Sequence, residues 1–365
     1  MAFVAFAAPG EVVEMEVERV HPDYLEGVAV RVLEPSPDRV DPRCPLFGQC
    51  GGCQLQHLDY KAQLHAKEGI VREQLRRIGH LDDKVVRPIV GAREPWAYRN
   101  NVRFSTGPTW GDVGFVHRRG RGLLKVDHCP IADAWVNELL PALHGKARGL
   151  HQVQVRHSDE TGSYLVYPAL EGLEVETGQT SYVEELGGRR FRVSASSFFQ
   201  VNHAQAEEMV RLVGEALPER GGVLVDAFAG VGTFAAIFAR RFERVIAIEE
   251  ARTAIRDAAE NVADLPNVEL REGKVELVLP ELEAAPDIVL LDPPRAGCAQ
   301  PVLEAIAEFR PRAVVYVSCN PATLARDLRS LVDAGFALEQ VTPLDMFPQT
   351  AHIEAVASLR LGGDP

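Results

Sequence analysis

The pattern of hydrophobic positions changes near residue 196. From there to the C-terminus, segments with helical spacing of apolar residues alternate with short apolar runs such as 223–225 and 288–291. Such runs are typical of parallel strands that are covered on both faces. The pattern predicts helices at residues 203–216, 233–241, 251–263, 300–308 and 322–334, and strands at 223–228, 244–249, 287–291, 313–318 and 352–359. This alternation predicts a doubly wound α/β domain whose ligands bind beyond the carboxyl ends of the strands.

The first 195 residues have a different pattern. Residues 1–40 alternate apolar and charged positions, as short β-strands do, and end in a Pro-rich stretch. Two or three strands cannot form a stable core alone, so we expect this segment to lean on another part or to be the remnant of a barrel. A helix is expected at residues 60–78, and short β-strands dominate from residue 85 to 192. We therefore expect three domains, at 1–40, 41–195 and 196–365, with helix 60–78 packing on the last.

Composition and charge narrow the class of protein. No apolar run of the 365 residues approaches the roughly 18 that a membrane helix needs, so we expect a soluble, cytoplasmic protein. The net charge of −13 disfavours a general nucleic-acid binder. Residues 61–125, however, hold 14 Lys and Arg against 6 Asp and Glu, interleaved with Phe104, Trp110 and Phe115. This segment is either an RNA-binding surface or the solvated edge of a hairpin, and both readings stay open.

A glycine-rich turn follows the first strand of the α/β domain. Gly230 and Gly232 lie between that strand and the next helix, where glycine lets a ligand approach the backbone. The third glycine of the dinucleotide fingerprint is absent, which disfavours NAD. Glu249 ends the following strand, where a carboxylate can accept hydrogen bonds from ribose hydroxyls. Asp226 at the start of the turn suits a cofactor with an amino group, so S-adenosylmethionine fits better, and another nucleotide remains the alternative.

Two neighbouring strands of this domain are expected to end in reactive groups. The first is followed by Asp292-Pro-Pro-Arg295, and the second by Cys319-Asn-Pro. Enzymes that methylate exocyclic amines use a similar acidic Pro-Pro motif followed by an aromatic residue, which Arg295 replaces here. A thiol at the adjacent strand end indicates methylation at carbon instead.

Uracil C5 becomes nucleophilic when a thiolate adds at C6, and the C5 proton must then be removed by a base. Cys319 and Glu354, on the last expected strand, fit these two roles. Cys298 is the rival nucleophile, in which case the enzyme would methylate cytosine C5.

Four of the six cysteines suggest a metal site. Cys44, Cys50 and Cys53 are close in sequence, and Cys129 follows at a distance. In a cytosolic protein, clustered cysteines indicate metal rather than disulfides. The spacing suits zinc and an iron–sulfur cluster equally.

Taken together, these motifs resemble the S-adenosylmethionine-dependent RNA uracil-C5 methyltransferases, which make 5-methyluridine in tRNA and rRNA. The resemblance extends from residue 3 to residue 360. Its marks are Pro9-Gly-Glu11, Cys44-Pro-Leu-Phe-Gly-Gln-Cys-Gly-Gly-Cys53, Ser197-Phe-Phe-Gln-Val-Asn202, Asp226-Ala-Phe-Ala-Gly-Val-Gly232, Leu291-Asp-Pro-Pro-Arg-Ala-Gly297, Val317-Ser-Cys-Asn-Pro321 and His352-Ile-Glu354.

The resemblance implies a Rossmann-like class I methyltransferase domain, a mainly β central domain and a truncated OB-like (TRAM-type) RNA-binding barrel at the N-terminus. It implies Cys319 as nucleophile and Glu354 as base. A [4Fe–4S] cluster is implied on Cys44, Cys50, Cys53 and Cys129. The residues implied around the cofactor and a flipped uracil are Gln200, Phe228, Gly230, Gly232, Thr233, Glu249 and Asp292.

The implied partner is structured RNA, and 23S rRNA is favoured over tRNA because the cysteine cluster is commoner in rRNA-acting relatives. No protein partner is implied, and we expect a monomer. Lys274 departs from the family pattern near the adenine, and Phe228 stands where Tyr is common. A metal-bearing RNA-binding protein that no longer catalyses methyl transfer is the alternative from a different class.

Overall fold

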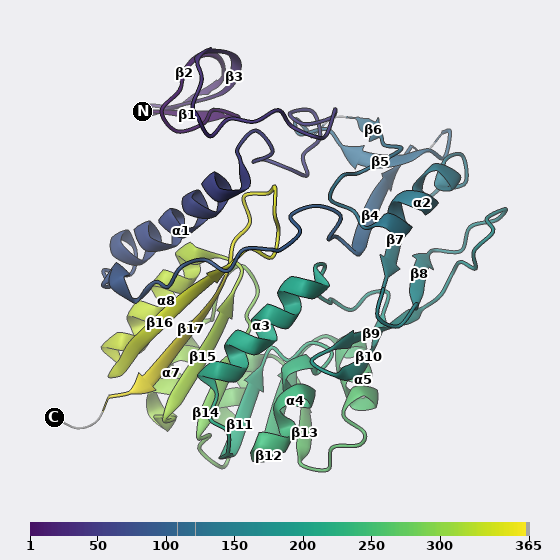
Figure 1. The fold of residues 1–365 in the computed structure, drawn as a ribbon. Coiled ribbons are helices and arrows are strands. Elements are labelled where there is room, and N and C mark those ends of the chain that lie inside the picture. The colour runs from purple at the N-terminus through teal and green to yellow at the C-terminus, as the bar shows by residue number, and fades with distance from the viewer. Residues whose placement is uncertain (108, 121, 363–365) are drawn as a thin grey trace.

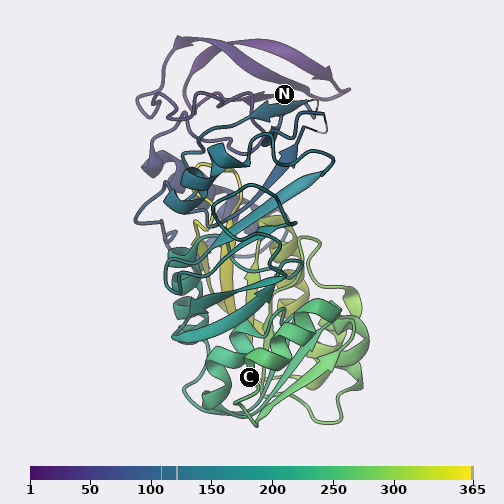
Figure 2. The same ribbon diagram turned by 90° about the vertical axis from the view of Figure 1, so that its right-hand side faces the viewer.

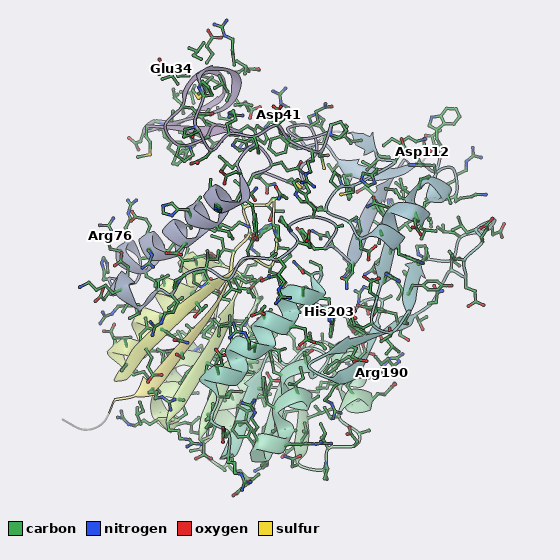
Figure 3. The ribbon with its side chains drawn as sticks, viewed as in Figure 1. Glu34, Asp41, Arg76, Asp112, Arg190 and His203 are labelled. Atoms are coloured by element: carbon green, nitrogen blue, oxygen red, sulfur yellow. The ribbon has the colours of Figure 1, made fainter. Side chains whose placement is uncertain are left out.

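The computed structural model describes residues 1–107, 109–120 and 122–362. Within these residues the chain forms four β-sheets, which follow one another along an elongated molecule (Figures 1 and 2). Charged side chains such as Glu34, Arg76 and Arg190 point away from the surface (Figure 3). None of the helices in the described part is both long and apolar enough to cross a membrane.

The largest sheet has seven strands in the order β13-β12-β11-β14-β15-β17-β16. Its strands are β11 Gly221–Ala227, β12 Phe242–Glu249, β13 Val268–Glu272, β14 Ile288–Leu291, β15 Ala313–Ser318, β16 Phe336–Leu344 and β17 Glu354–Leu361. The first five in this order are parallel, whereas β17 runs antiparallel to both β15 and β16.

Helices cover both faces of this sheet. Its helices are α3 His203–Ala216, α4 Thr233–Phe238, α5 Arg252–Asn261, α6 Val275–Val278, α7 Gln300–Phe309 and α8 Pro321–Asp333. Leu224 faces the core shared with α3, α4 and α5, and the next residue, Val225, faces the core shared with α6, α7 and α8. Burial on both faces explains why the strands are apolar throughout. The expected doubly wound α/β architecture is thus confirmed.

Two strands of this sheet were not predicted from the sequence. β13 is short and half-polar, and β16 contains Pro343 and the polar residues Glu339, Gln340 and Thr342, so neither has the pattern of a buried strand. β16 lies at the edge of the sheet, where a proline is tolerated because few backbone donors are needed. The expected helix 233–241 ends as an α-helix at Phe238 and continues as a 3₁₀ turn, Ala239–Arg241. Two further 3₁₀ turns span Asp83–Val85 and Leu279–Glu281.

Helix α1, Tyr60–Arg77, lies beside α8 and β16 (Figure 1). Its N-terminus is capped by Asp59, whose carboxylate accepts a hydrogen bond from the Ala62 amide at 2.8 Å. Val71 and Leu75 pack into the same core as α7 and α8. A segment that is distant in sequence therefore completes one face of the seven-stranded sheet.

The middle of the molecule contains a five-stranded antiparallel sheet in the order β6-β5-β4-β7-β8 and a two-stranded ribbon. The strands are β4 Asn101–Thr106, β5 Val113–Val116, β6 Leu123–Lys125, β7 Gln152–His157, β8 Tyr164–Tyr167, β9 Ser181–Leu186 and β10 Arg189–Ser194. Helix α2, Ala134–Leu143, covers one face, with Leu140 and Leu143 in the core around Phe104. We did not predict this helix, which is short and contains Pro141.

The N-terminal sheet has the order β1-β3-β2, with β1 Ala2–Ala5, β2 Val12–Val20 and β3 Leu25–Glu34. It leans on the turn between β5 and β6, because Glu18 forms ion pairs with Arg118 at 2.5 Å and with Arg119 at 3.0 Å. Phe6 packs edge-on against Phe47 of the cysteine segment, with 5.0 Å between ring centroids. Contacts with other segments therefore support these three strands.

Candidate active site

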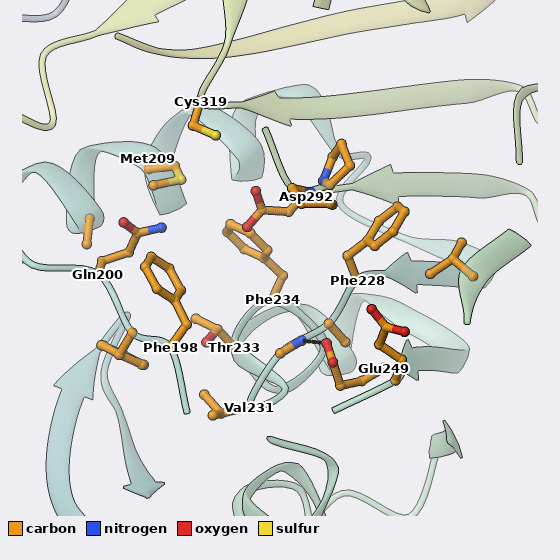
Figure 4. Close-up of a pocket in the computed structure, with 18 of the residues that line it drawn as sticks. Phe198, Gln200, Met209, Phe228, Val231, Thr233, Phe234, Glu249, Asp292 and Cys319 are labelled. Carbon is orange, nitrogen blue, oxygen red and sulfur yellow. Dashed lines mark hydrogen bonds between the residues drawn. The ribbon is translucent and has the colours of Figure 1, made fainter. Parts of the chain in front are cut away.

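A cavity of about 500 Å³ lies at the carboxyl ends of the parallel strands of the large sheet (Figure 4). Its wall includes the loops after β11, β12, β13, β14 and β15, the start of β17, residues 198–200, and side chains of α3, α4 and α6. This is the place where a doubly wound sheet binds ligands. The sequence-predicted residues that line it are Gln200, Phe228, Gly230, Thr233, Glu249, Asp292, Cys319 and Glu354.

The turn between β11 and α4 depends on left-handed backbone conformations. Phe228 has a φ of 68° and Gly232 a φ of 82°. Gly232 is the N-cap of α4 and does not line the cavity, so its contribution is to the shape of the turn. Asp226 is also outside the wall: it is fully buried and accepts a hydrogen bond from the Ala235 amide at 2.8 Å. Asp226 therefore holds the start of α4 instead of contacting an amino group of the cofactor, as the sequence suggested.

The carboxylate of Glu249 is fixed by two backbone amides. It accepts hydrogen bonds from Gly230 N at 2.8 Å, drawn in Figure 4, and from Ala251 N at 2.7 Å. Each carboxylate oxygen keeps a further lone pair for a ligand hydroxyl. The side chain is thus held at the end of β12 with free acceptor capacity toward the cavity.

Cys319 and Glu354 line the same cavity, together with Asp292. Burial raises the pKa of the Glu354 carboxyl to about 8; Asp292 adds to the rise and Arg295 opposes it. Burial also raises the pKa of the Cys319 thiol to about 11, with further contributions from Glu354 and Asp292. Desolvation raises the pKa of Asp292 to about 7. A cation bound in this cavity would lower all three pKa values and favour the charged forms.

Residues 198–200 all line the cavity, and the outer two, Phe198 and Gln200, have features that indicate a ligand. The side-chain oxygen of Gln200 is buried and has no hydrogen-bond partner among the described residues. Because an unpaired buried acceptor is costly, it indicates a donor group on a ligand. Phe198 is 67% exposed and borders both this cavity and a second one. No role for Phe198 is expected from the sequence, although only one of two adjacent aromatic residues can easily face the core, and here that residue is Phe199.

Cys298 lies outside this cavity. It is buried, and its backbone amide donates to Asp327 at 2.8 Å. Burial raises the pKa of its thiol to about 12. The alternative that Cys298 is a nucleophile therefore lacks access to a substrate.

The second cavity, of about 470 Å³, is lined by Cys44, Cys50, Cys53 and Cys129. No three of these sulfur atoms all lie within 4.8 Å of one another in the described residues. Tetrahedral zinc would need sulfur atoms about 3.8 Å apart, given Zn–S bonds of roughly 2.3 Å. The four sulfur atoms are therefore not arranged as a closed tetrahedral zinc site. Burial raises the pKa of the Cys53 thiol to about 12, so a set of thiolates here requires a cationic group.

Only part of the basic segment between residues 61 and 125 faces the cavities. Arg118 and Arg119 pair with the N-terminal sheet, and Phe104 is fully buried in the central core. Arg99 and Arg103 line the second cavity, and Arg103 also borders a third one. Arg156, which lies outside this segment, also lines the second cavity, so the segment supplies only part of the positive charge there.

The comparisons with known proteins agree on one class. The family model described as tRNA (Uracil-5-)-methyltransferase matches residues 175–272 and 275–360. An uncharacterized RNA methyltransferase of Halalkalibacterium halodurans is 35% identical, covering 98% of this chain and 92% of its own length. An uncharacterized RNA methyltransferase of Thermosynechococcus vestitus is 33% identical, and the match covers 98% of this chain and 93% of that protein.

A solved structure is also similar over nearly the whole chain. It is the tRNA (uracil-54, C5)-methyltransferase of Pyrococcus abyssi in complex with S-adenosyl-L-homocysteine. It is 27% identical, with a TM-score of 0.75, and the match covers 98% of this chain and 95% of that one.

Proposed function

Since the chain belongs to the tRNA (uracil-5-)-methyltransferase family and has the Rossmann-like class I methyltransferase fold, we propose that it methylates C5 of a uridine in structured RNA through a covalent Cys319 adduct. One observation carries the proposal: the thiol of Cys319 and the carboxyl of Glu354 line one cavity at the cofactor end of the sheet. A nucleophile and a base are the two groups that this reaction requires.

S-adenosylmethionine is the proposed methyl donor. The bound S-adenosyl-L-homocysteine of the Pyrococcus abyssi structure supports this assignment. In this chain Glu249 would accept hydrogen bonds from the ribose hydroxyls, and Phe228, Gly230 and Thr233 would line the adenosyl group. The positive sulfonium would lie near Asp292, whose carboxylate it would stabilise in the charged form.

The target base must leave the RNA stack, because C5 and C6 are otherwise covered by neighbouring bases. The Cys319 thiolate forms a bond to C6, and the electrons of the C5–C6 double bond move toward C5 and O4. C5 then attacks the sulfonium methyl, whose bond to sulfur breaks to leave neutral S-adenosylhomocysteine. Glu354 takes the C5 proton, the double bond re-forms, and the thiolate is expelled.

Gln200 is the proposed contact for the uracil ring. Its unpartnered side-chain oxygen can accept a hydrogen bond from N3–H, which distinguishes uracil from cytosine because cytosine N3 carries no proton. Phe198, exposed at the junction of the two cavities, offers a stacking face for a base.

The cysteine site is proposed to hold a [4Fe–4S] cluster on Cys44, Cys50, Cys53 and Cys129. Methyl transfer needs no electron, so the cluster would supply cross-links between segments rather than redox chemistry. The proposed substrate is 23S rRNA. The Pyrococcus abyssi structure, which is a tRNA (uracil-54) enzyme, makes tRNA the second candidate.

RNA that contains 5-fluorouridine tests the mechanism. Fluorine at C5 cannot leave as a proton, so the methylated adduct should persist as a covalent complex on a denaturing gel. Absence of this complex with the wild-type protein and S-adenosylmethionine would refute the proposal. Mass mapping of 5-methyluridine in rRNA and tRNA from a strain that lacks the protein would identify the substrate.

A further inference from the structure

The loop between β16 and β17 is held by two segments that are distant in sequence. This loop precedes Glu354 and extends away from the sheet toward α1 (Figure 1). At its centre, Gln349 is buried and has a φ of 71°. A left-handed conformation is unfavourable for a residue other than glycine, and it persists only where the surroundings fix it. The contacts of Gln349 therefore decide where the start of β17 lies.

The first anchor is α1. Gln63, which is 1% exposed, accepts a hydrogen bond from the Gln349 amide at 3.1 Å and donates one to the Gln349 side-chain oxygen at 3.0 Å. These paired bonds do not involve the cysteines.

The second anchor is the cysteine segment. The Gln349 carbonyl accepts hydrogen bonds from the amides of Gln54 at 3.1 Å and Leu55 at 3.0 Å. The side chain of Gln54 accepts a further one from the Ala351 amide at 3.1 Å and donates to the Gly51 carbonyl at 2.9 Å. Gly51 lies between Cys50 and Cys53, and Gln54 directly follows Cys53. One glutamine thus connects the proposed metal site to residues three and five positions before Glu354.

Cys319 is positioned by different contacts. It follows β15, whose neighbours are β14 and β17, and the next residue, Asn320, caps α8. The Asn320 side chain donates to the Arg295 carbonyl at 3.0 Å. The hydrogen bonds from the cysteine segment to the α/β domain go to the loop of Glu354, so a change in that segment reaches the carboxyl before it reaches the thiol.

We propose that Gln54 is a positioning residue for Glu354, through which the metal-bound cysteine segment fixes the loop that carries the base. The inference rests on the proposed function, because it assigns the metal site to one step of that reaction. Removal of the C5 proton requires a carboxyl oxygen of Glu354 within about 2.6–3.2 Å of C5. Addition of the thiolate to C6 does not require this contact. Weakening the Gln54 anchor therefore slows release of the methylated base and leaves formation of the adduct unchanged.

Gln54→Ala separates the two steps. With 5-fluorouridine RNA, the variant should form the covalent complex at the wild-type rate. With uridine RNA, kcat should fall about tenfold or more, and the methylated adduct should accumulate during turnover. Gln49→Ala is the matched control: this exposed residue precedes Cys50 and should match the wild type in both assays. Gln54→Glu keeps the acceptor for the Ala351 amide and loses the donor to the Gly51 carbonyl. Its kcat should therefore lie between those of the wild type and Gln54→Ala.

Hydrogen exchange gives a readout that is independent of activity. Removing the metal by oxidation and chelation, followed by iron analysis and visible absorption, should speed exchange of the amides at 349–354 and leave α8 unchanged. In Gln54→Ala these amides should exchange quickly with the metal still bound.

Equal losses of adduct formation and turnover in Gln54→Ala, or wild-type behaviour in both, would overturn the positioning role. Unchanged exchange at 349–354 after metal removal would do the same. Failure of the proposed function has a different signature, since the wild-type protein itself would then form no adduct. The exchange measurement would still decide whether the two segments are coupled.

Discussion

Cys319 and Glu354 flank the last pair of the ladder between β15 and β17. Ser318 pairs with Ala355 in the antiparallel register; Cys319 is the residue after Ser318, and Glu354 directly precedes Ala355. The pairing of the two strands therefore brings the thiol and the carboxyl to the same end of the ladder, where both residues line the cavity. Asp292, at the end of the neighbouring β14, completes the acidic wall.

Replacing Cys319 and Cys298 in turn distinguishes the two candidate nucleophiles. Cys319→Ala should abolish both turnover and the covalent complex with 5-fluorouridine RNA, because no other thiol lines the cavity in the described part of the chain. Cys298→Ala should keep the complex, since that side chain is buried elsewhere. Denaturing gels of both variants make the comparison. A complex that persists in Cys319→Ala would remove that residue from the mechanism.

The variant Glu354→Gln should still transfer the methyl group to the base, but it should not release the methylated base from Cys319. The amide cannot take the C5 proton, and a general base is worth about 10²–10⁴-fold in rate. Single-turnover experiments with labelled cofactor should show label that is attached to both RNA and protein. Normal turnover in this variant would exclude Glu354 as the base.

The same variant should change the pH dependence of stability. The pKa of Glu354 is about 8 in the folded protein against an ordinary value of 4.5, so the folded state holds the proton more tightly. The stabilisation from this proton is full below pH 4.5 and is lost as the pH rises through 8. Glutamine does not ionise, so Glu354→Gln should match the wild type near pH 4.5. At pH 9 the melting temperature of the variant should be several degrees higher than that of the wild type. A difference in melting temperature that does not grow with pH would contradict this expectation.

A buried ion pair holds the other end of the loop that precedes β17. Lys67 of α1 lies 2.5 Å from Asp345, and both side chains are almost fully buried. Lys67→Met leaves an uncompensated charge and should lower the free energy of unfolding by about 3–5 kcal/mol. Urea denaturation measures this loss. Lys61→Met, exposed on the same helix, should change stability little, and Lys67→Met/Asp345→Asn should recover part of the loss.

Arg103 tests the remaining basic surface. It borders two cavities next to the proposed target site, so we expect it to contact an RNA phosphate. Arg103→Ala should weaken RNA binding. It should also reduce, by about one, the slope of the logarithm of the binding constant against the logarithm of the salt concentration. Arg271→Ala, which removes an exposed partner of Glu269 on β13, should leave binding unchanged. Equal affinities of the two variants would place the RNA elsewhere.

The sequence by itself determined the α/β domain and the positions of its reactive residues along the chain. Parallel strands buried on both faces are apolar throughout, so β11, β14 and β15 could be located from their composition. The residues that follow such strands share one edge of the sheet, and this placed Asp292 and Cys319 near the glycine-rich turn. The cysteine spacing likewise indicated a metal site without any knowledge of the fold.

Only the tertiary structure decided which of these residues meet. β17 enters the sheet between β15 and β16, and this pairing brings Glu354 to the end of the ladder at which Cys319 lies. It also removed Cys298 from the cavity and joined Gln54 to the loop of Gln349. These relationships arise from backbone pairing between segments tens to hundreds of residues apart. Strand pairing depends on the packing of the whole sheet, so no local pattern of hydrophobic and polar residues encodes it.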